Sequence, residues 1–204
     1  MMSPVVVFAT ELEKNAILEQ ELPWILSGVG LASTYRSLML ANPTGPLINL
    51  GICGAYPGTG VNIGDVVMVQ DEVIADLGME NAHQGLFKPL RDYPFGTSHE
   101  VIECATFPFD GIPLVHACTV STVTGTLATG VSRRDLYNAT IETMEGYAVT
   151  DYANARGVQC VQLRAVSNIA STRDMQPQNI QLALNNLARW WTENGESLVR
   201  MIRG

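Results

Sequence analysis

The chain has 204 residues, 47% hydrophobic and 16% charged, a balance that excludes intrinsic disorder, collagen-like sequence and coiled coil. Twelve Lys and Arg against twenty Asp and Glu give a net charge of -8, which argues against a nucleic-acid partner because phosphates would be repelled. The length suits one large α/β domain and no linker or internal repeat interrupts it, so we expect residues 1–204 to form a single domain.

The first strand, the cysteines and the histidines give no sign of export or metal binding. The apolar run Val5–Ala9 is too short for a signal peptide or a membrane span. The four cysteines form no CxxC motif, and the three histidines lack the i, i+4 spacing of a helical zinc pair. We therefore expect a reduced, cytoplasmic protein with no membrane association, no metal and no organic cofactor.

Along the chain, short apolar runs alternate with segments of helical spacing. Strands are expected at residues 5–8, 24–26, 47–50, 65–73, 114–120, 140–144 and 158–166. Helices are expected at residues 11–18, 31–41, 132–137, 145–156 and from Pro177 onward. Residues 76–111 are expected to form a long excursion of loops and short pieces. Strands that are apolar throughout are buried on both faces, so the pattern predicts a three-layer α/β/α sandwich around a mixed, largely parallel sheet.

In such sheets, ligands bind beyond the carboxyl ends of the strands. Five segments follow expected strands or join a strand to a helix, and we expect the functional site among them. They are residues 9–13, 27–30, 51–55, 144–145 and 167–174.

Several of these segments resemble motifs of the purine nucleoside phosphorylase and nucleosidase superfamily. The matching segments are Ala9-Thr10-Glu11-Leu12-Glu13, the glycine loop Gly51-Ile52-Cys53-Gly54-Ala55, Ile63-Gly64-Asp65-Val66-Val67, Met144-Glu145-Gly146 and Leu163-Arg164-Ala165-Val166-Ser167-Asn168. The resemblance spans nearly the whole chain. It implies that the protein binds a purine nucleoside as its small-molecule substrate and cleaves the bond between purine and ribose.

The resemblance also assigns roles to residues. Glu13 would activate the attacking water, although its spacing alone indicates an acid in the first turn of a helix. Glu145 would accept hydrogen bonds from both ribose hydroxyls, with Met144 packed beneath the sugar. If the resemblance is set aside, Glu145 can equally be an acid at the start of a helix and Met144 a core residue. The other substrate-binding residues it implies are Cys53, Gly54, Thr143 and Ser167.

Within the superfamily, three features resemble the futalosine hydrolases, enzymes of an alternative menaquinone pathway. They are Asn168 where methylthioadenosine nucleosidases have Asp, the segment 121–126, and the segment 75–80 with Gly85-Leu86-Phe87. Thr143 and Tyr147 depart from that subfamily, where Asn and Ala are expected. Asn168 has no acidic proton and can only hydrogen-bond a purine, which favours a 6-oxopurine; a flipped amide would also satisfy adenine, and a simple turn asparagine remains an alternative.

Water is the expected nucleophile because no phosphate clamp is evident. The Ser27–Gly30 loop offers backbone N–H groups, but the first cation after it is Arg36, well inside the next helix. The alternatives are a methylthioadenosine or S-adenosylhomocysteine nucleosidase, a purine nucleoside phosphorylase, and a non-catalytic nucleoside-binding protein of the same fold.

The last expectations concern the 5' end of the substrate. Futalosine carries a carboxyphenyl ketone there, so Arg173 is predicted to bind its carboxylate, unless it pairs with Asp174 or a surface acid. Lys88 and Arg91 are the next candidates. Related nucleosidases are homo-oligomers in which a neighbour's loop closes this side of the site, and residues 76–95 are the expected loop.

Overall fold

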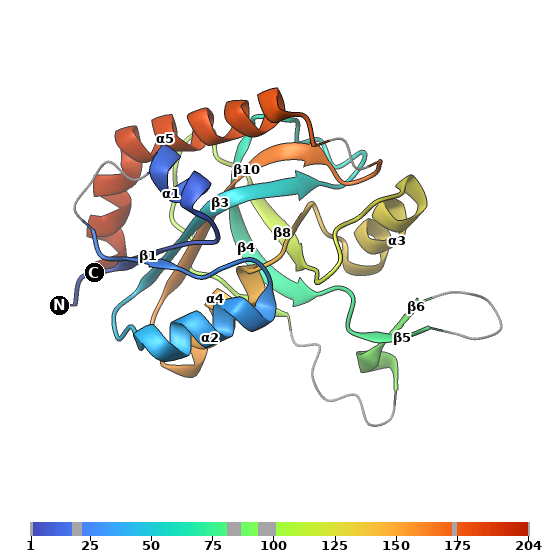
Figure 1. The fold of residues 1–204 in the computed structure, drawn as a ribbon, viewed down its shortest axis with the longest axis horizontal. Helices are drawn as coiled ribbons and strands as arrows, with labels where there is room; N and C mark the ends of the chain where they lie inside the picture. The colour runs from blue at the N-terminus through green and yellow to red at the C-terminus, as the bar shows by residue number, and fades with distance from the viewer. Residues whose placement is uncertain (1, 18–21, 81–86, 94–100, 173–174, 204) are drawn as a thin grey trace.

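The computed structural model describes residues 2–17, 22–80, 87–93, 101–172 and 175–203. An eight-stranded sheet lies at its centre, with helices on both faces, which confirms the predicted three-layer α/β/α fold (Figure 1). Its strands are β1 (Val5–Phe8), β2 (Trp24–Leu26), β3 (Leu47–Ala55), β4 (Val66–Ile74), β7 (Ile102–Glu103), β8 (Leu114–Thr119), β9 (Ile141–Thr143) and β10 (Cys160–Ile169).

The sheet is mixed and largely parallel, as predicted. Its order is β10-β4-β8-β9-β3-β1-β2, with β7 paired to β4 and β10 also paired to β3. The pairs β4–β10, β3–β9 and β4–β7 are antiparallel and the remaining pairs are parallel. The carboxyl end of β3 therefore has β9 on one side and β10 on the other.

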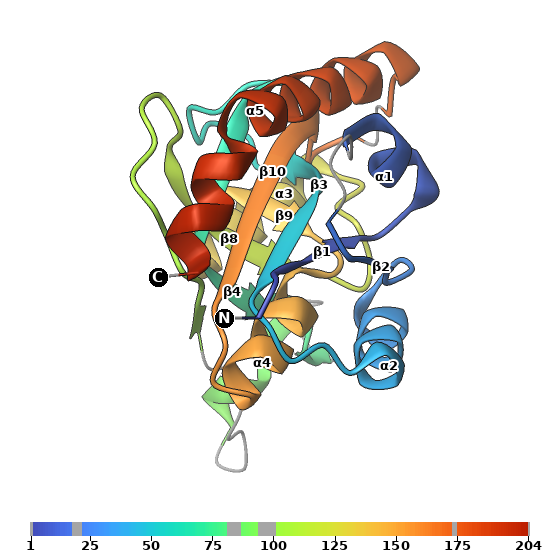
Figure 2. The ribbon, with the colours of Figure 1, turned by 90° about the vertical axis from the view of Figure 1, so that its left-hand side faces the viewer.

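The helices divide between the two faces of the sheet. Figure 2 shows α1 (Glu11–Ile17) and α5 (Pro177–Arg203) on one side and α2 (Leu31–Ala41) and α4 (Gly146–Ala155) on the other. Leu184, Leu187 and Trp191 of α5 are buried in the main core, because apolar residues recur along this helix at helical spacing. None of the helices among the described residues is long and apolar enough to cross a membrane.

The excursion between β4 and β8 consists of loops and short elements, as the sequence indicates. β5 (Gly78–Glu80) and β6 (Phe87–Pro89) form a separate two-stranded ribbon, followed by the 3-10 helix η1 (Leu90–Asp92). Figure 1 shows this ribbon projecting from the main body. Parts of the excursion, residues 81–86 and 94–100, lie outside the described residues.

Two sequence-based predictions were wrong, one for the start of a helix and one for the type of an element. The helix expected at residues 132–137 is α3 (Leu127–Tyr137), which begins earlier because the Thr126 hydroxyl accepts a hydrogen bond from Thr129 N (3.1 Å). Residue 130, within α3, is a glycine because a Cβ at this position would clash with the Ala170 carbonyl oxygen. The expected glycine loop at residues 51–55 is instead the second half of β3.

Candidate active site

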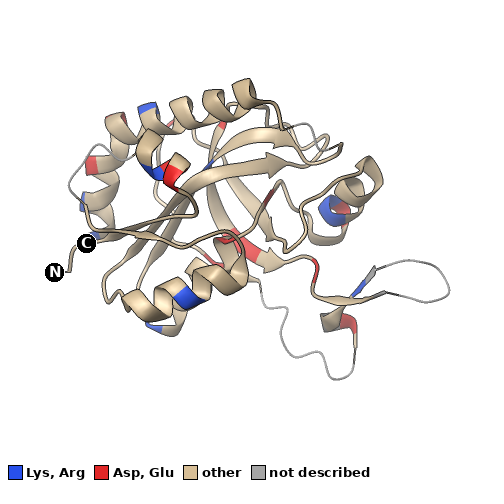
Figure 3. Ribbon diagram, viewed as in Figure 1, with Lys and Arg blue, Asp and Glu red and all other residues tan. Residues whose placement is uncertain are grey.

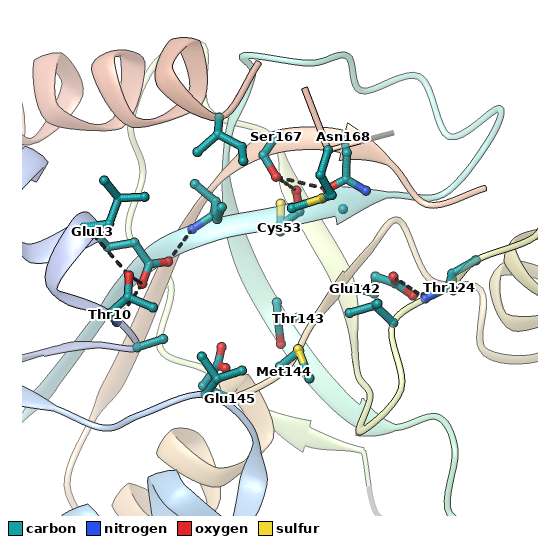
Figure 4. Close-up of a pocket in the computed structure, with 18 residues that line it drawn as sticks. Thr10, Glu13, Cys53, Thr124, Glu142, Thr143, Met144, Glu145, Ser167 and Asn168 are labelled. Carbon is teal, nitrogen blue, oxygen red and sulfur yellow. Dashed lines mark hydrogen bonds between the residues drawn. The ribbon is translucent and has the colours of Figure 1, made fainter. Parts of the chain in front are cut away.

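A cavity of about 310 Å³ opens at the carboxyl ends of the strands. All five segments expected to form the site contribute to its wall, which confirms their predicted convergence. The lining residues are Ala9, Thr10, Leu12, Glu13, Val29, Ile52, Cys53, Gly54, Val123, Thr124, Glu142, Thr143, Met144, Glu145, Ser167, Asn168, Met175 and Ile180. Figure 4 shows Glu13, Glu145, Glu142 and Asn168 approaching the cavity from different sides.

Glu13 is fixed in the first turn of α1 and is only 4% exposed. Its Oε2 accepts hydrogen bonds from Thr10 N (3.0 Å) and Thr10 Oγ1 (2.8 Å), while Glu13 N donates to Thr10 Oγ1 (3.2 Å). This reciprocal pair is a capping box, so Glu13 does act as an acid in the first turn of the helix. However, Oε1 accepts from Ile52 N of β3 (3.1 Å), so the carboxylate is also held against the cavity wall.

Arg164 of β10 lies behind this carboxylate and was not predicted as a site residue. It is 1% exposed and donates from Nη2 to Gln162 Oε1 (3.0 Å). Its ladder partner on β3 is Gly51, where a Cβ would lie 2.6 Å from Glu13 Oε1 and 2.8 Å from Arg164 Nη1. Glycine at position 51 therefore allows the carboxylate and the guanidinium to approach each other over the strand.

Glu145 is the N-cap residue of α4 and is 6% exposed. Its Oε1 accepts a hydrogen bond from Gly30 N (2.9 Å), at the N-terminus of α2. Burial raises the pKa of Glu145, and the nearby Glu13 carboxylate raises it further, while Arg164 and the Gly30 N–H act in the opposite direction. Glu145 and Glu13 are thus two carboxyl groups on one cavity, and Glu13 is close enough to raise the pKa of Glu145.

Asn168 lies at the end of β10 with Ser167 beside it. The Ser167 hydroxyl lies 3.1 Å from the Cys53 carbonyl oxygen and 3.0 Å from Asn168 Oδ1, to both of which it can donate. With Oδ1 held by Ser167, the amide NH2 group of Asn168 points away from the serine, as Figure 4 shows. The site therefore presents hydrogen-bond donors to a ligand at this position.

A buried polar network lies beneath the site and also escaped prediction from sequence. Glu72 of β4 is fully buried and accepts a hydrogen bond from Thr119 Oγ1 (2.8 Å), which in turn accepts from Tyr147 N (2.8 Å) in the first turn of α4. Thr143 Oγ1 lies 3.4 Å from Glu72 Oε1 and accepts from Gly146 N (3.2 Å). Figure 3 shows this acidic segment of β4 within the sheet. The two hydroxyls link Glu72 to the helix that starts directly after Glu145.

The loop 121–126 forms another wall and is held by two charged side chains. Asp76 Oδ2 accepts hydrogen bonds from Ser121 N (2.7 Å) and Thr122 N (3.0 Å). Arg133 of α3 donates from Nη1 to the Thr122 carbonyl oxygen (2.9 Å) and lies 3.8 Å from Asp76 through Nη2. Segments 75–80 and 121–126, noted separately in the sequence, are therefore joined by Asp76.

We expect Asp76→Ala to lower the free energy of unfolding by about 1 to 3 kcal/mol, because two backbone N–H groups and Arg133 lose their acceptor. The KM for the substrate bound in this cavity should rise as the loop loses its support. Chemical denaturation and steady-state kinetics measure the two effects. Unchanged stability would show that water replaces the carboxylate without loss.

Eight of the nine predicted site residues line the cavity: Glu13, Cys53, Gly54, Thr143, Met144, Glu145, Ser167 and Asn168. The ninth, Arg173, lies outside the described residues. Of its two alternatives, Lys88 lies over the ring of Tyr93 at 4.4 Å and does not line the cavity, and the side chain of Arg91 lies outside the described part of the structure. Glu142 lines the cavity although the sequence did not single it out.

The α/β/α fold with this cavity at the strand ends is that of the nucleoside-cleaving phosphorylases and nucleosidases. The family model of the phosphorylase superfamily matches residues 26–203, so the chain belongs to this superfamily. It is 31% identical over 180 residues to a futalosine hydrolase of Thermus thermophilus, covering 81% of this chain and 77% of the relative. It is 33% identical over 192 residues to a futalosine hydrolase of Streptomyces coelicolor, covering 86% of this chain and 80% of that relative.

Solved structures share the fold at low sequence identity. A futalosine hydrolase mutant of Helicobacter pylori has a TM-score of 0.76 at 16% identity, covering 96% of this chain and 100% of that chain. A 5'-methylthioadenosine/S-adenosylhomocysteine nucleosidase of Neisseria meningitidis has a TM-score of 0.74 at 18% identity, covering 95% of this chain and 98% of that chain.

Proposed function

We propose that this protein is a futalosine hydrolase: it cleaves the N-glycosidic bond of futalosine with water and releases hypoxanthine and dehypoxanthine futalosine for menaquinone biosynthesis. One observation carries the proposal. The cavity has carboxylates, Glu13 and Glu145, on one side and the neutral amide of Asn168 on another, which suits a sugar on the first side and an uncharged 6-oxopurine on the second. The names of the relatives from Thermus thermophilus and Streptomyces coelicolor support the same activity.

Glu13 takes the proton of the attacking water in this mechanism. The water oxygen forms a bond to C1' of the ribose as the bond from C1' to the purine nitrogen breaks, and the bonding electrons leave with the purine. Glu13 is held on both oxygens, so its carboxylate enters the reaction without reorganisation. A protein that only binds nucleosides would have no use for a buried water activator.

Glu145 accepts the ribose hydroxyls and Met144 packs against the sugar. As the bond breaks, positive charge develops on the ribose, and a carboxylate on its hydroxyls then interacts more strongly than in the ground state. The Gly30 N–H group uses one oxygen of Glu145 and fixes its direction, leaving lone pairs for the substrate.

Asn168 receives the departing base, with Ser167, Cys53 and Gly54 forming the adjoining wall. Because Ser167 holds Oδ1, the amide NH2 group faces the base and donates to acceptors such as O6 and N7 of hypoxanthine. This orientation favours a 6-oxopurine over adenine, whose 6-amino group is a donor. The purine takes its final proton from solvent, since Asn168 has none to give.

Water is favoured over phosphate by the position of Glu145. The N–H group of Gly30 would be a natural phosphate ligand, but it already donates to the Glu145 carboxylate (2.9 Å). A phosphate dianion at this place would meet a negative charge. Arg36 does not compensate, because it is exposed on α2 and does not line the cavity.

The cavity mouth is apolar and accessible. Leu12, Val29 and Met175 line it and are 58%, 53% and 43% exposed. An aromatic 5' substituent such as the carboxyphenyl group of futalosine would cover these side chains and remove their apolar surface from water. Arg173, two residues before Met175 in the sequence, is the cation that we propose for its carboxylate.

The test is incubation of the purified protein with futalosine, inosine and methylthioadenosine, each with and without phosphate, with the released bases separated by chromatography. Phosphate-independent release of hypoxanthine from futalosine is expected. Phosphate-dependent turnover of inosine would make the protein a phosphorylase, and cleavage of methylthioadenosine alone would make it a methylthioadenosine nucleosidase.

The protein is further proposed to work in the cytoplasm as a homo-oligomer in which the segment 76–95 of one subunit covers the site of another. The projecting β5–β6 ribbon supports this assembly, because its described residues do not line the cavity of their own chain. Full specific activity in a monomer, isolated by size-exclusion chromatography at high dilution, would rule out a shared site.

A further inference from the structure

Glu142 is a buried acid on the cavity wall that the mechanism above does not use. It belongs to β9, two residues before Met144, and is 4% exposed. A carboxylate in a ligand cavity costs desolvation energy, so its presence needs a reason. One reason is structural, because it supports the loop 121–126; the geometry points to a second.

The sheet places Glu142 opposite Asn168. Gly54 of β3 is the ladder partner of Glu142 on β9 and also of Asn168 on β10. Ladder partners project from the same face, so both side chains rise beside a glycine that has none. A Cβ at Gly54 would lie 3.2 Å from Asn168 Nδ2 and 3.3 Å from Glu142 Cγ. The bare backbone of Gly54 is therefore the floor of a slot bounded by an amide and a carboxylate.

The Glu142 carboxylate is fixed and keeps room for one more donor. Its Oε1 accepts from Thr124 N (2.9 Å), and its Oε2 accepts from Thr124 Oγ1 and lies 3.5 Å from Arg133 Nη1. Each carboxylate oxygen has two lone pairs, so Oε1 retains one. Arg133 places a positive charge beside this carboxylate, and a carboxylate accepts hydrogen bonds and donates none.

The two purine classes differ at the edge that would face this oxygen. A 6-oxopurine carries a hydrogen on N1 beside its O6 acceptor, whereas a 6-aminopurine has an unprotonated N1 that is itself an acceptor. With Asn168 Nδ2 donating to O6 and N7, the N1–H of hypoxanthine can donate to Glu142. In adenine the lone pair of N1 would face the carboxylate with no proton between them, so that two buried hydrogen-bond acceptors repel each other.

We propose that Glu142 is a specificity-determining residue that accepts the N1–H of a 6-oxopurine and excludes 6-aminopurines; this rests on the proposed nucleosidase activity. The Glu142 carboxylate also favours the Asn168 orientation in which the NH2 group, and not Oδ1, faces Glu142. The sequence left open whether the Asn168 amide is flipped; Ser167 and Glu142 both favour the same orientation and so answer that question.

The experiment compares wild type with Glu142→Gln on futalosine and on its analogue with a 6-amino group. We expect wild type to prefer the 6-oxo substrate in kcat/KM by about 100-fold or more, and Glu142→Gln to reduce this ratio at least about tenfold. The matched control is Glu196→Gln, because Glu196 is exposed on α5 and does not line the cavity. It should leave the ratio of the two kcat/KM values unchanged.

Binding of free bases gives a measurement independent of chemistry and of the variant's folding. By calorimetry, wild type should bind hypoxanthine at least about tenfold more tightly than adenine and than 1-methylhypoxanthine, which lacks the N1–H. Equal binding of the three bases, or an unchanged substrate ratio in folded Glu142→Gln, would overturn the role of Glu142 while leaving the hydrolase intact. If wild type cleaves neither nucleoside, the proposed function itself fails.

Discussion

Glu13→Gln should reduce kcat for futalosine by about 1,000-fold, within the range found when a general base is removed. Substrate binding should change little, because the side chain keeps its volume and glutamine is accepted at this position of a capping box. The amide oxygen can accept from Ile52 N while the NH2 group donates to Thr10 Oγ1, so that only Thr10 N loses its acceptor. What is lost is the ability to take a proton from water. Rapid-mixing kinetics for turnover and calorimetry with a product base for binding measure the two effects.

The control is Glu11→Gln in the same first turn of α1. Glu11 is 61% exposed, pairs with Lys14 (2.8 Å) and does not line the cavity, so its loss should leave kcat unchanged. Unfolding free energies of both variants show whether either helix is damaged. A folded Glu13→Gln enzyme with near-normal kcat would remove Glu13 from the mechanism.

Sequence was sufficient for the features that depend on local pattern. The strands β1 and β2 and the helix α2 begin and end at the predicted residues, because β-branched runs and helical spacing need no distant partner to be recognised. The convergence of five segments on one cavity was also predictable, since ligands in such sheets lie beyond the carboxyl ends of the strands.

What the sequence could not show is which residues face each other across the sheet. Glu142 and Glu72 lie within apolar strands and carry no local signal of a site, and Arg164 was noted only as part of a family motif, without a role. Their roles depend on register: Gly51 opposite Arg164, and Gly54 opposite both Glu142 and Asn168. For the same reason, residues 51–55 looked like a loop. The two glycines belong to a strand whose neighbours' polar side chains occupy the space that a Cβ would need.

The buried carboxyl group of Glu72 should make the stability of the protein depend on pH. Burial raises its pKa to about 7, although Arg164 and hydrogen bonds from Thr119, Gln162 and Thr143 lower it. In the unfolded chain the pKa of a glutamate is about 4.3. The folded state therefore holds the proton more tightly, and the stability gained is complete below about pH 4.3 and is lost as the pH rises through about 7. The difference between the two pKa values corresponds to about 4 kcal/mol over the whole titration.

Glu72→Gln removes this titration but retains an amide of similar size in the network. The unfolding free energy of wild type relative to the variant should therefore fall by about 3 kcal/mol between about pH 4.5 and about pH 8, since all other titrating groups are common to both proteins. Urea unfolding at several pH values measures the difference. Glu196→Gln is the matched control, because Glu196 is exposed on α5 and its 3.9 Å pair with Arg200 adds little. A difference that grows with pH would mean that Arg164 stabilises an ionised Glu72, and that the helix after Glu145 rests on a buried ion pair instead of a neutral acid.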